Sequence, residues 1–155
     1  MKTTATLIAA ALLLTSAGLN AALAHDGKKY SAGAPGNPKK PARTVAVILT
    51  DDNGAMRYEP NRVEVKKGEQ VRFVLENKGL LKHEFILASV QDNKKHGELM
   101  KKFPHMEHDE PNSKSLEPGQ KAEVLWQFSK AGTFEFACLI PGHYDAGMRG
   151  SATVK

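Results

Sequence analysis

The chain has 155 residues, of which 41% are hydrophobic, 25% charged and 6% aromatic, and its formal net charge at pH 7 is +5. This balance is typical of a single folded domain. It excludes a disordered chain, a collagen and a protein with several membrane spans, and it leaves little room for a second domain.

The first 24 residues predict a secretory signal peptide. Lys2 precedes an apolar run from Leu7 to Leu14, and Ala22-Leu23-Ala24 fits an A-x-A cleavage site. A short apolar run that ends in small residues is typical of a signal peptide, and a retained membrane anchor is the alternative. We therefore expect periplasmic export, cleavage after Ala24 and no stable membrane insertion.

The segment 25–43 is rich in Gly, Pro and Lys without periodicity, which predicts a flexible basic tail. From residue 44 onward, short apolar or alternating runs indicate strands. These runs are Val45–Leu49, Val63–Val65, Val71–Leu75, Phe85–Leu87, Ala122–Phe128, Phe134–Cys138 and Ser151–Val154. Such short strands, separated by frequent turn signals, predict an all-β antiparallel sandwich over residues 44–155.

The strand pattern disappears in an insertion that covers residues 89–115. Within it, Asn93 to Phe103 predicts a short helix with Leu99 and Phe103 on one side. The stretch 104–111 that follows predicts an exposed loop.

Cys138 is the only cysteine, although an exported protein folds where disulfides form. An inert buried thiol, an intermolecular bridge and a metal thiolate are the possible roles. His143 and Met148 follow closely, and this set of thiolate, imidazole and thioether suits copper in both oxidation states. Pro141-Gly142 and Gly147 allow the chain to bend back toward Cys138, so the ligands can share one ion. A second imidazole is required, and His83 is the best candidate because it begins a predicted strand.

The spacing C-x4-H-x4-M with an upstream His resembles the cupredoxins, or blue-copper proteins. The segment from Cys138 to Gly150 is similar to the rusticyanin-like and periplasmic copper-tolerance branches. The resemblance implies a Greek-key β-sandwich with one short helix or loop insertion. It also implies one type 1 copper with His83, Cys138 and His143 as trigonal ligands and Met148 as the weak axial ligand.

One departure from the family pattern is Glu84, which follows His83 where many members place Asn or a small polar residue. We expect Glu84 to alter the brace on the Cys138 loop, and with it the colour and potential of the site. A binuclear copper domain would carry two cysteines, so the single cysteine implies a mononuclear site.

The resemblance implies one-electron transfer through Cu(I)/Cu(II) cycling. The side chains of Phe85, Phe136 and Ile140 are expected to tune the potential, and His143 is expected to be the electron port. One hypothesis is a periplasmic carrier whose redox partner is a cytochrome or a copper oxidase. The other is a copper-tolerance protein that binds or oxidises excess Cu(I) and works with other copper-handling proteins.

Enzyme activity is not expected. Cys138 and His143 lack the orienting partner and oxyanion site that a nucleophilic enzyme needs. No phosphate-binding loop and no aromatic-basic pattern for nucleic acid is visible.

His105, Met106 and His108 form a compact cluster that could bind a second, weaker copper ion, with His96 and Met100 upstream. A chance grouping in an exposed loop is the alternative. Such a site would favour a sequestering or delivery protein without a dedicated electron-transfer partner. Cleavage after Ala24 would also make His25 amino-terminal and able to chelate copper. The flexible tail behind His25 argues against the fixed histidine brace of a copper mono-oxygenase.

Overall fold

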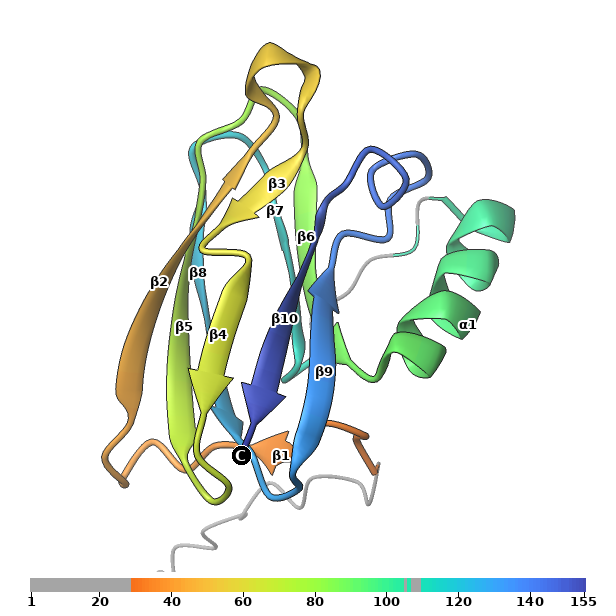
Figure 1. Cartoon of the computed structure of the whole chain (residues 1–155). Helices are drawn as coiled ribbons and strands as arrows, with labels where there is room; N and C mark the ends of the chain where they lie inside the picture. The colour runs from red at the N-terminus through yellow and green to blue at the C-terminus, as the bar shows by residue number, and fades with distance from the viewer. Residues whose placement is uncertain (1–28, 105, 107–109) are drawn as a thin grey trace, which may run out of the picture.

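The computed structural model describes residues 29–104, 106 and 110–155. Two five-stranded sheets face each other, and one helix lies beside them (Figure 1). The strand order is β1-β8-β5-β2-β3 in the first sheet and β4-β10-β9-β6-β7 in the second. The strands are β1 (Ala34–Pro35), β2 (Arg43–Thr50), β3 (Arg57–Glu59), β4 (Arg62–Val65), β5 (Gln70–Asn77), β6 (His83–Ala88), β7 (Ser113–Leu116), β8 (Lys121–Gln127), β9 (Gly132–Ala137) and β10 (Arg149–Val154). The predicted β-sandwich is therefore confirmed.

Both sheets are mixed, whereas the sequence predicted antiparallel pairing throughout. Strands β2 and β5 are parallel, as are β10 and β4, and the remaining pairs are antiparallel. For β2 and β5, the parallel pairing follows from their connection, which passes through β4 in the opposite sheet. The chain thus returns beside β2 in the same direction, as a crossover requires.

The flexible-tail prediction is wrong for residues 30–43 and lies outside the described residues for 25–28. Ala32 is fully buried, and the indole N–H of Trp126 donates a 3.2 Å hydrogen bond to its carbonyl. Strand β1 pairs with β8 at the edge of the first sheet. Gly33, at φ +137°, lies so close to β8 that a Cβ would come within 2.1 Å of the Gln127 carbonyl oxygen. The glycine here permits close packing rather than disorder.

The predicted helix is confirmed as α1 (Val90–Lys102), but its buried face differs from the expected one. Its N-cap residue is Ser89, whose hydroxyl accepts a 3.1 Å hydrogen bond from the Asp92 N–H. Asn93 and Met100 are buried, whereas Leu99 is 40% exposed and Phe103, just after the helix, is 58% exposed. The Asn93 amide donates to Glu135 Oε1 at 3.1 Å, and this bond stabilises a polar residue under the helix.

An aromatic cluster fills the space between the sheets along the strands that lead to the predicted site. The rings of Phe85 on β6 and Phe136 on β9 stack with their centroids 5.2 Å apart. Tyr58 of β3 packs edge-on against both rings. Within the described ranges, no helix is both long and apolar enough to cross a membrane.

Candidate metal centre

Three of the four predicted ligands converge at one end of the sandwich. A ring nitrogen of His83, the sulfur of Cys138 and a ring nitrogen of His143 all lie within 4.8 Å of one another. His83 begins β6, Cys138 directly follows β9, and His143 lies in the turn between β9 and β10. In the part of the chain that the structure describes, this is the one group of three or more His, Cys, Asp or Glu side chains with such geometry.

Backbone hydrogen bonds close the loop that carries Cys138, His143 and Met148, called the ligand loop below. The Cys138 N–H donates to the Met148 carbonyl at 3.1 Å, and the Met148 N–H donates to the His143 carbonyl at 3.0 Å. Gly142 and Gly147 have φ values of +90° and +102°, which permit the two bends that the sequence predicted. Met148 is fully buried in the same core cluster as Cys138. Met148, the fourth predicted ligand, is thus joined to Cys138 by a backbone hydrogen bond and is buried with it in the core.

Burial sets the protonation of these side chains. Cys138 is fully buried, and this burial, with a smaller effect of Glu84, raises the pKa of its thiol to about 12. Burial lowers the pKa of His83. Burial, and to a smaller degree the nearby His83, lower the pKa of His143. The two imidazoles are therefore neutral at physiological pH, as metal ligands must be.

His83 also has unsatisfied polar atoms. Its side chain is fully buried, and neither ring nitrogen makes a hydrogen bond of good geometry with the described residues. Buried polar atoms without partners are rare and require an explanation. The Cys138 sulfur lies 3.4 Å from Nδ1 of His143, so the soft donor and the imidazoles lie together. Two neutral imidazoles and one thiol fit copper well.

Glu84 supports the Cys138 sulfur through its backbone. The Glu84 N–H donates to the sulfur at 3.3 Å, and the hydroxyl of Tyr58 donates to the Glu84 carbonyl. The carboxyl group is buried, and its Oε1 accepts a 3.3 Å hydrogen bond from Ser115, whereas Oε2 makes no hydrogen bond with the residues that the structure describes. Burial raises the pKa of Glu84 to about 7, although the Ser115 bond opposes this change. Its effect on colour and potential stays a prediction.

Asp51 is a site residue that sequence reasoning missed. It directly follows β2, and its carboxylate Oδ2 lies 3.3 Å from Nε2 of His83. Burial acts to raise the pKa of Asp51, but hydrogen bonds from the Leu80 and Leu81 N–H groups and the proximity of His83 lower it overall. The only sequence signal was an acidic pair after a strand, which also fits an ordinary turn.

A cavity of about 500 Å³ lies beside His143. It is lined by Leu81, Lys82, Glu84, Pro104, Met106, Ile140, Pro141 and His143. Met106, one member of the predicted second copper site, therefore shares a cavity with His143, a predicted ligand of the main site. His105 and His108, the other two members, lie outside the described residues, as does His25.

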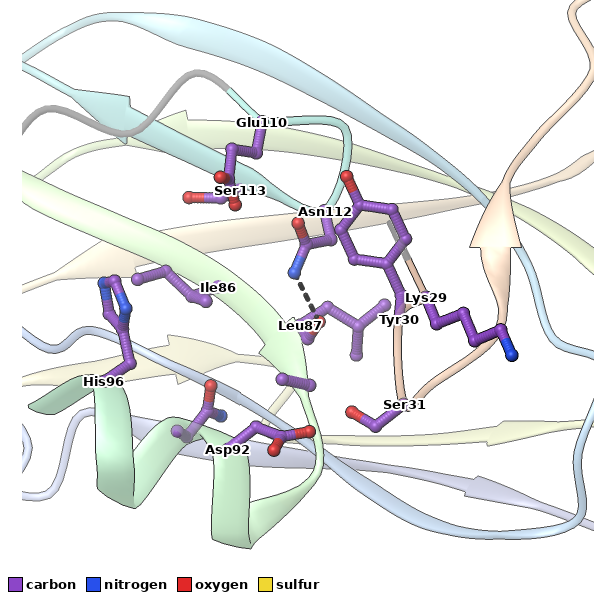
Figure 2. Close-up of a pocket in the computed structure, with 12 residues that line it drawn as sticks. Lys29, Tyr30, Ser31, Ile86, Leu87, Asp92, His96, Glu110, Asn112 and Ser113 are labelled. Atoms are coloured by element: carbon purple, nitrogen blue, oxygen red, sulfur yellow. Dashed lines mark hydrogen bonds between the residues drawn. The ribbon is translucent and has the colours of Figure 1, made fainter. Parts of the chain in front are cut away.

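His96 and Met100 lie in different surroundings. Met100 is fully buried in a small cluster against which Met106 packs. His96 lines a different pocket, of about 200 Å³, between α1, β6 and the segments that carry Tyr30 and Asn112. Figure 2 shows His96 on the helix, among the residues that line this pocket. The structure therefore separates His96 from Met106.

Comparisons with known proteins agree with this geometry. A sequence profile of copper-binding proteins of the plastocyanin/azurin family matches residues 45–155. The copper-resistant cuproprotein CopI of Rubrivivax gelatinosus is 41% identical over 97% of this chain and 95% of its own length. CopI of Pseudomonas aeruginosa is 38% identical over 79% of this chain and 82% of its own.

The fold is similar to that of a solved auracyanin. Dithionite-reduced auracyanin from Roseiflexus castenholzii superposes with a TM-score of 0.62 at 20% identity, over 75% of this chain and 99% of that one. The family profile and the relatives indicate a copper-binding protein rather than an enzyme. The chain belongs to the plastocyanin/azurin family of copper-binding proteins, the cupredoxins.

Proposed function

We propose that this protein is an exported copper-tolerance cupredoxin that holds one type 1 copper ion. His83, Cys138 and His143 would bind the ion, and Met148 would be the weak axial ligand. The convergence of the first three donor groups within 4.8 Å carries the proposal. Copper bound there would supply one-electron exchange between Cu(I) and Cu(II).

The residues around the site favour a fixed donor set. His83 lies on a strand, and Cys138 is held by the Glu84 N–H and by the backbone bond to Met148. Phe85 and Phe136 are fully buried beside these strands and exclude water. A rigid donor set lowers the reorganisation energy when copper changes between Cu(I) and Cu(II), because the ligands need not move.

His143 supports a route for electrons. It is only partly buried, and it lines the cavity beside the site together with Leu81 and Pro141. Leu81 and the neighbouring Leu80 are 46% and 87% exposed. A His143→Gly variant should exchange electrons slowly with small redox reagents, and exchange at the wild-type rate would contradict this route.

Similarity over nearly the whole chain to a copper-resistant cuproprotein favours tolerance as the physiological role. The second candidate is a carrier that exchanges electrons with a cytochrome or a copper oxidase, and the exposed Leu80 and Leu81 favour it. A sequestering or delivery role is the third, and Met106 in the His143 cavity favours that role.

A complementation experiment separates these roles. A strain that lacks the gene should become copper-sensitive, and the wild-type chain but not Cys138→Ser should restore growth. If His105→Ala/His108→Ala fails to restore growth although its main site is intact, sequestration is favoured. Growth in copper that does not depend on Cys138 would contradict the tolerance proposal, and recovery of the chain outside the periplasmic fraction would contradict export.

A further inference from the structure

The carboxylate of Asp51 lies where the end of β2 meets the turn before His83. Its side chain is only 7% exposed. Oδ1 accepts a 2.9 Å hydrogen bond from the Leu80 N–H, and Oδ2 accepts one of 2.8 Å from the Leu81 N–H. A Cβ on Gly79 would lie 2.9 Å from this carboxylate, so the turn fits closely around it. Asp51 is thus a buried acceptor that fixes the turn leading into β6.

The same carboxylate faces one nitrogen of the His83 ring. Oδ2 lies 3.3 Å from Nε2, just beyond the range of about 2.7–3.2 Å that is usual for an N–H···O hydrogen bond, so a small shift would bring the two atoms into hydrogen-bond distance. An ionised carboxylate can only accept, so any hydrogen bond between the two requires the proton on Nε2. The lone pair of His83 is then on Nδ1.

We propose that Asp51 is a positioning residue of the copper site, which accepts the Nε2–H of His83 and thereby directs Nδ1 to the metal. This inference rests on the proposed function. Carboxylates behind metal-bound imidazoles fix the ring and its tautomer and make the ring a stronger donor. The negative charge also favours the more highly charged ion, so Asp51 should stabilise Cu(II) more than Cu(I).

The test is Asp51→Asn, a variant of nearly the same shape without the charge. Its affinity for Cu(II), measured by competition with a chelator, should fall about 10–100-fold, and its affinity for Cu(I) should fall less. Each tenfold difference between the two losses raises the reduction potential by about 59 mV. The matched control is Asp52→Asn, because Asp52 is 53% exposed and pairs with Arg57 rather than with a ligand. That control should keep the wild-type affinities and potential.

Three results would overturn the inference. One is wild-type Cu(II) affinity and potential in Asp51→Asn. Another is an equal loss of Cu(I) and Cu(II) affinity with an unchanged potential, because an anchor for Leu80 and Leu81 alone predicts that pattern. The last is a wild-type protein that binds no copper through Cys138. That result would also contradict the proposed function, and it would be seen before any variant is made.

A measurement on the wild-type chain applies even if Asp51→Asn does not fold. Long-range 1H–15N NMR on the Cu(I)-loaded, 15N-labelled protein reports which nitrogen of His83 carries the proton. We expect the proton on Nε2, with slow solvent exchange, and a metal-shifted Nδ1. A proton on Nδ1 with Nε2 bound to copper would overturn the proposal.

Discussion

The backbone N–H of Glu84 donates a 3.3 Å hydrogen bond to the sulfur of Cys138. Strand β6, which begins with His83, therefore also supports the thiol of Cys138, which directly follows β9. Strands β6 and β9 lie side by side in the second sheet. Two predicted ligands far apart in the sequence are held by neighbouring strands of one sheet, and this explains how a small domain can present a fixed donor set.

Copper binding should release a proton from Cys138. In the metal-free protein the thiol has a pKa of about 12, while burial lowers the pKa values of His83 and His143 and keeps both imidazoles neutral. Because copper binds the thiolate, we expect about one proton per copper at pH 8 and an apparent affinity that rises with pH. Titration in a weakly buffered solution measures the release.

The pH of 8 is chosen because it lies above the pKa of about 7 of Glu84, which is then largely ionised and contributes little. Cys138→Ser is the control and should release almost no proton. Binding by the wild-type chain without proton release would show that the thiol is not a ligand.

Glu84→Gln should change how stability depends on pH in the metal-free protein. The pKa of Glu84 is about 7 in the folded state, above its ordinary value of 4.5. The folded state therefore holds this proton more tightly than the unfolded state, and the stability gained from it is complete below pH 4.5 and lost as the pH rises through 7. Above pH 8, Glu84→Gln should be more stable than wild type by up to about 3 kcal/mol.

Urea unfolding at pH 5 and pH 8 measures this difference. Glu123→Gln serves as the control, because that carboxylate is 52% exposed and pairs with Arg72. If Glu84→Gln loses as much stability as wild type between the two pH values, the buried carboxyl is not the cause.

Gly150→Ala should destabilise the fold near the ligand loop. A Cβ at this position of β10 would lie 2.3 Å from the ring of Phe136 and 2.7 Å from the carbonyl oxygen of Asn61. The backbone contact cannot relax easily, so we expect a loss of about 1–3 kcal/mol in the free energy of unfolding. The control is Gly97→Ala in α1, where the added Cβ would lie 3.9 Å from Leu139, an ordinary van der Waals contact, and the change should stabilise by about 0.5–1 kcal/mol. Equal effects of the two substitutions in urea unfolding would contradict the close packing at Gly150.

The second copper site that the sequence predicts would change the number of copper ions bound per chain. Met106 lines the cavity beside His143, and His105 and His108 flank it in the sequence. The wild-type chain should bind more than one copper, and His105→Ala/His108→Ala should lose the weaker equivalent while it keeps the visible band of the main site. Elemental analysis after dialysis measures this. A wild-type ratio of one, unchanged in the double variant, would contradict a second site.

The donor groups that converge at the end of the sandwich could be predicted because most of the candidate residues lie close together in the sequence. Cys138, His143 and Met148 occupy one loop, and the alternation of Phe134 and Phe136 already placed Cys138 on the buried face. His83 was identifiable because it begins a strand with the same alternation.

Contacts across the fold could not be predicted. Asp51 looked like a turn residue, since nothing local indicates that β2 ends beside the turn before His83. The helix face was missed because Asn93 is polar and is stabilised by Glu135 on β9, a partner that periodicity cannot identify. Ala34 and Pro35 pair with β8, a partner distant in the sequence, whereas the glycines and prolines of this segment suggested flexibility.

The most direct test of the central claim is a visible absorption spectrum of the purified mature protein during titration with Cu(II), beside Cys138→Ser under the same conditions. We predict an intense thiolate-to-copper band that saturates at one copper for the main site, and no such band in Cys138→Ser. The absence of an intense band in the wild-type chain, with Cys138 still open to alkylation in the presence of copper, would contradict the copper site described above.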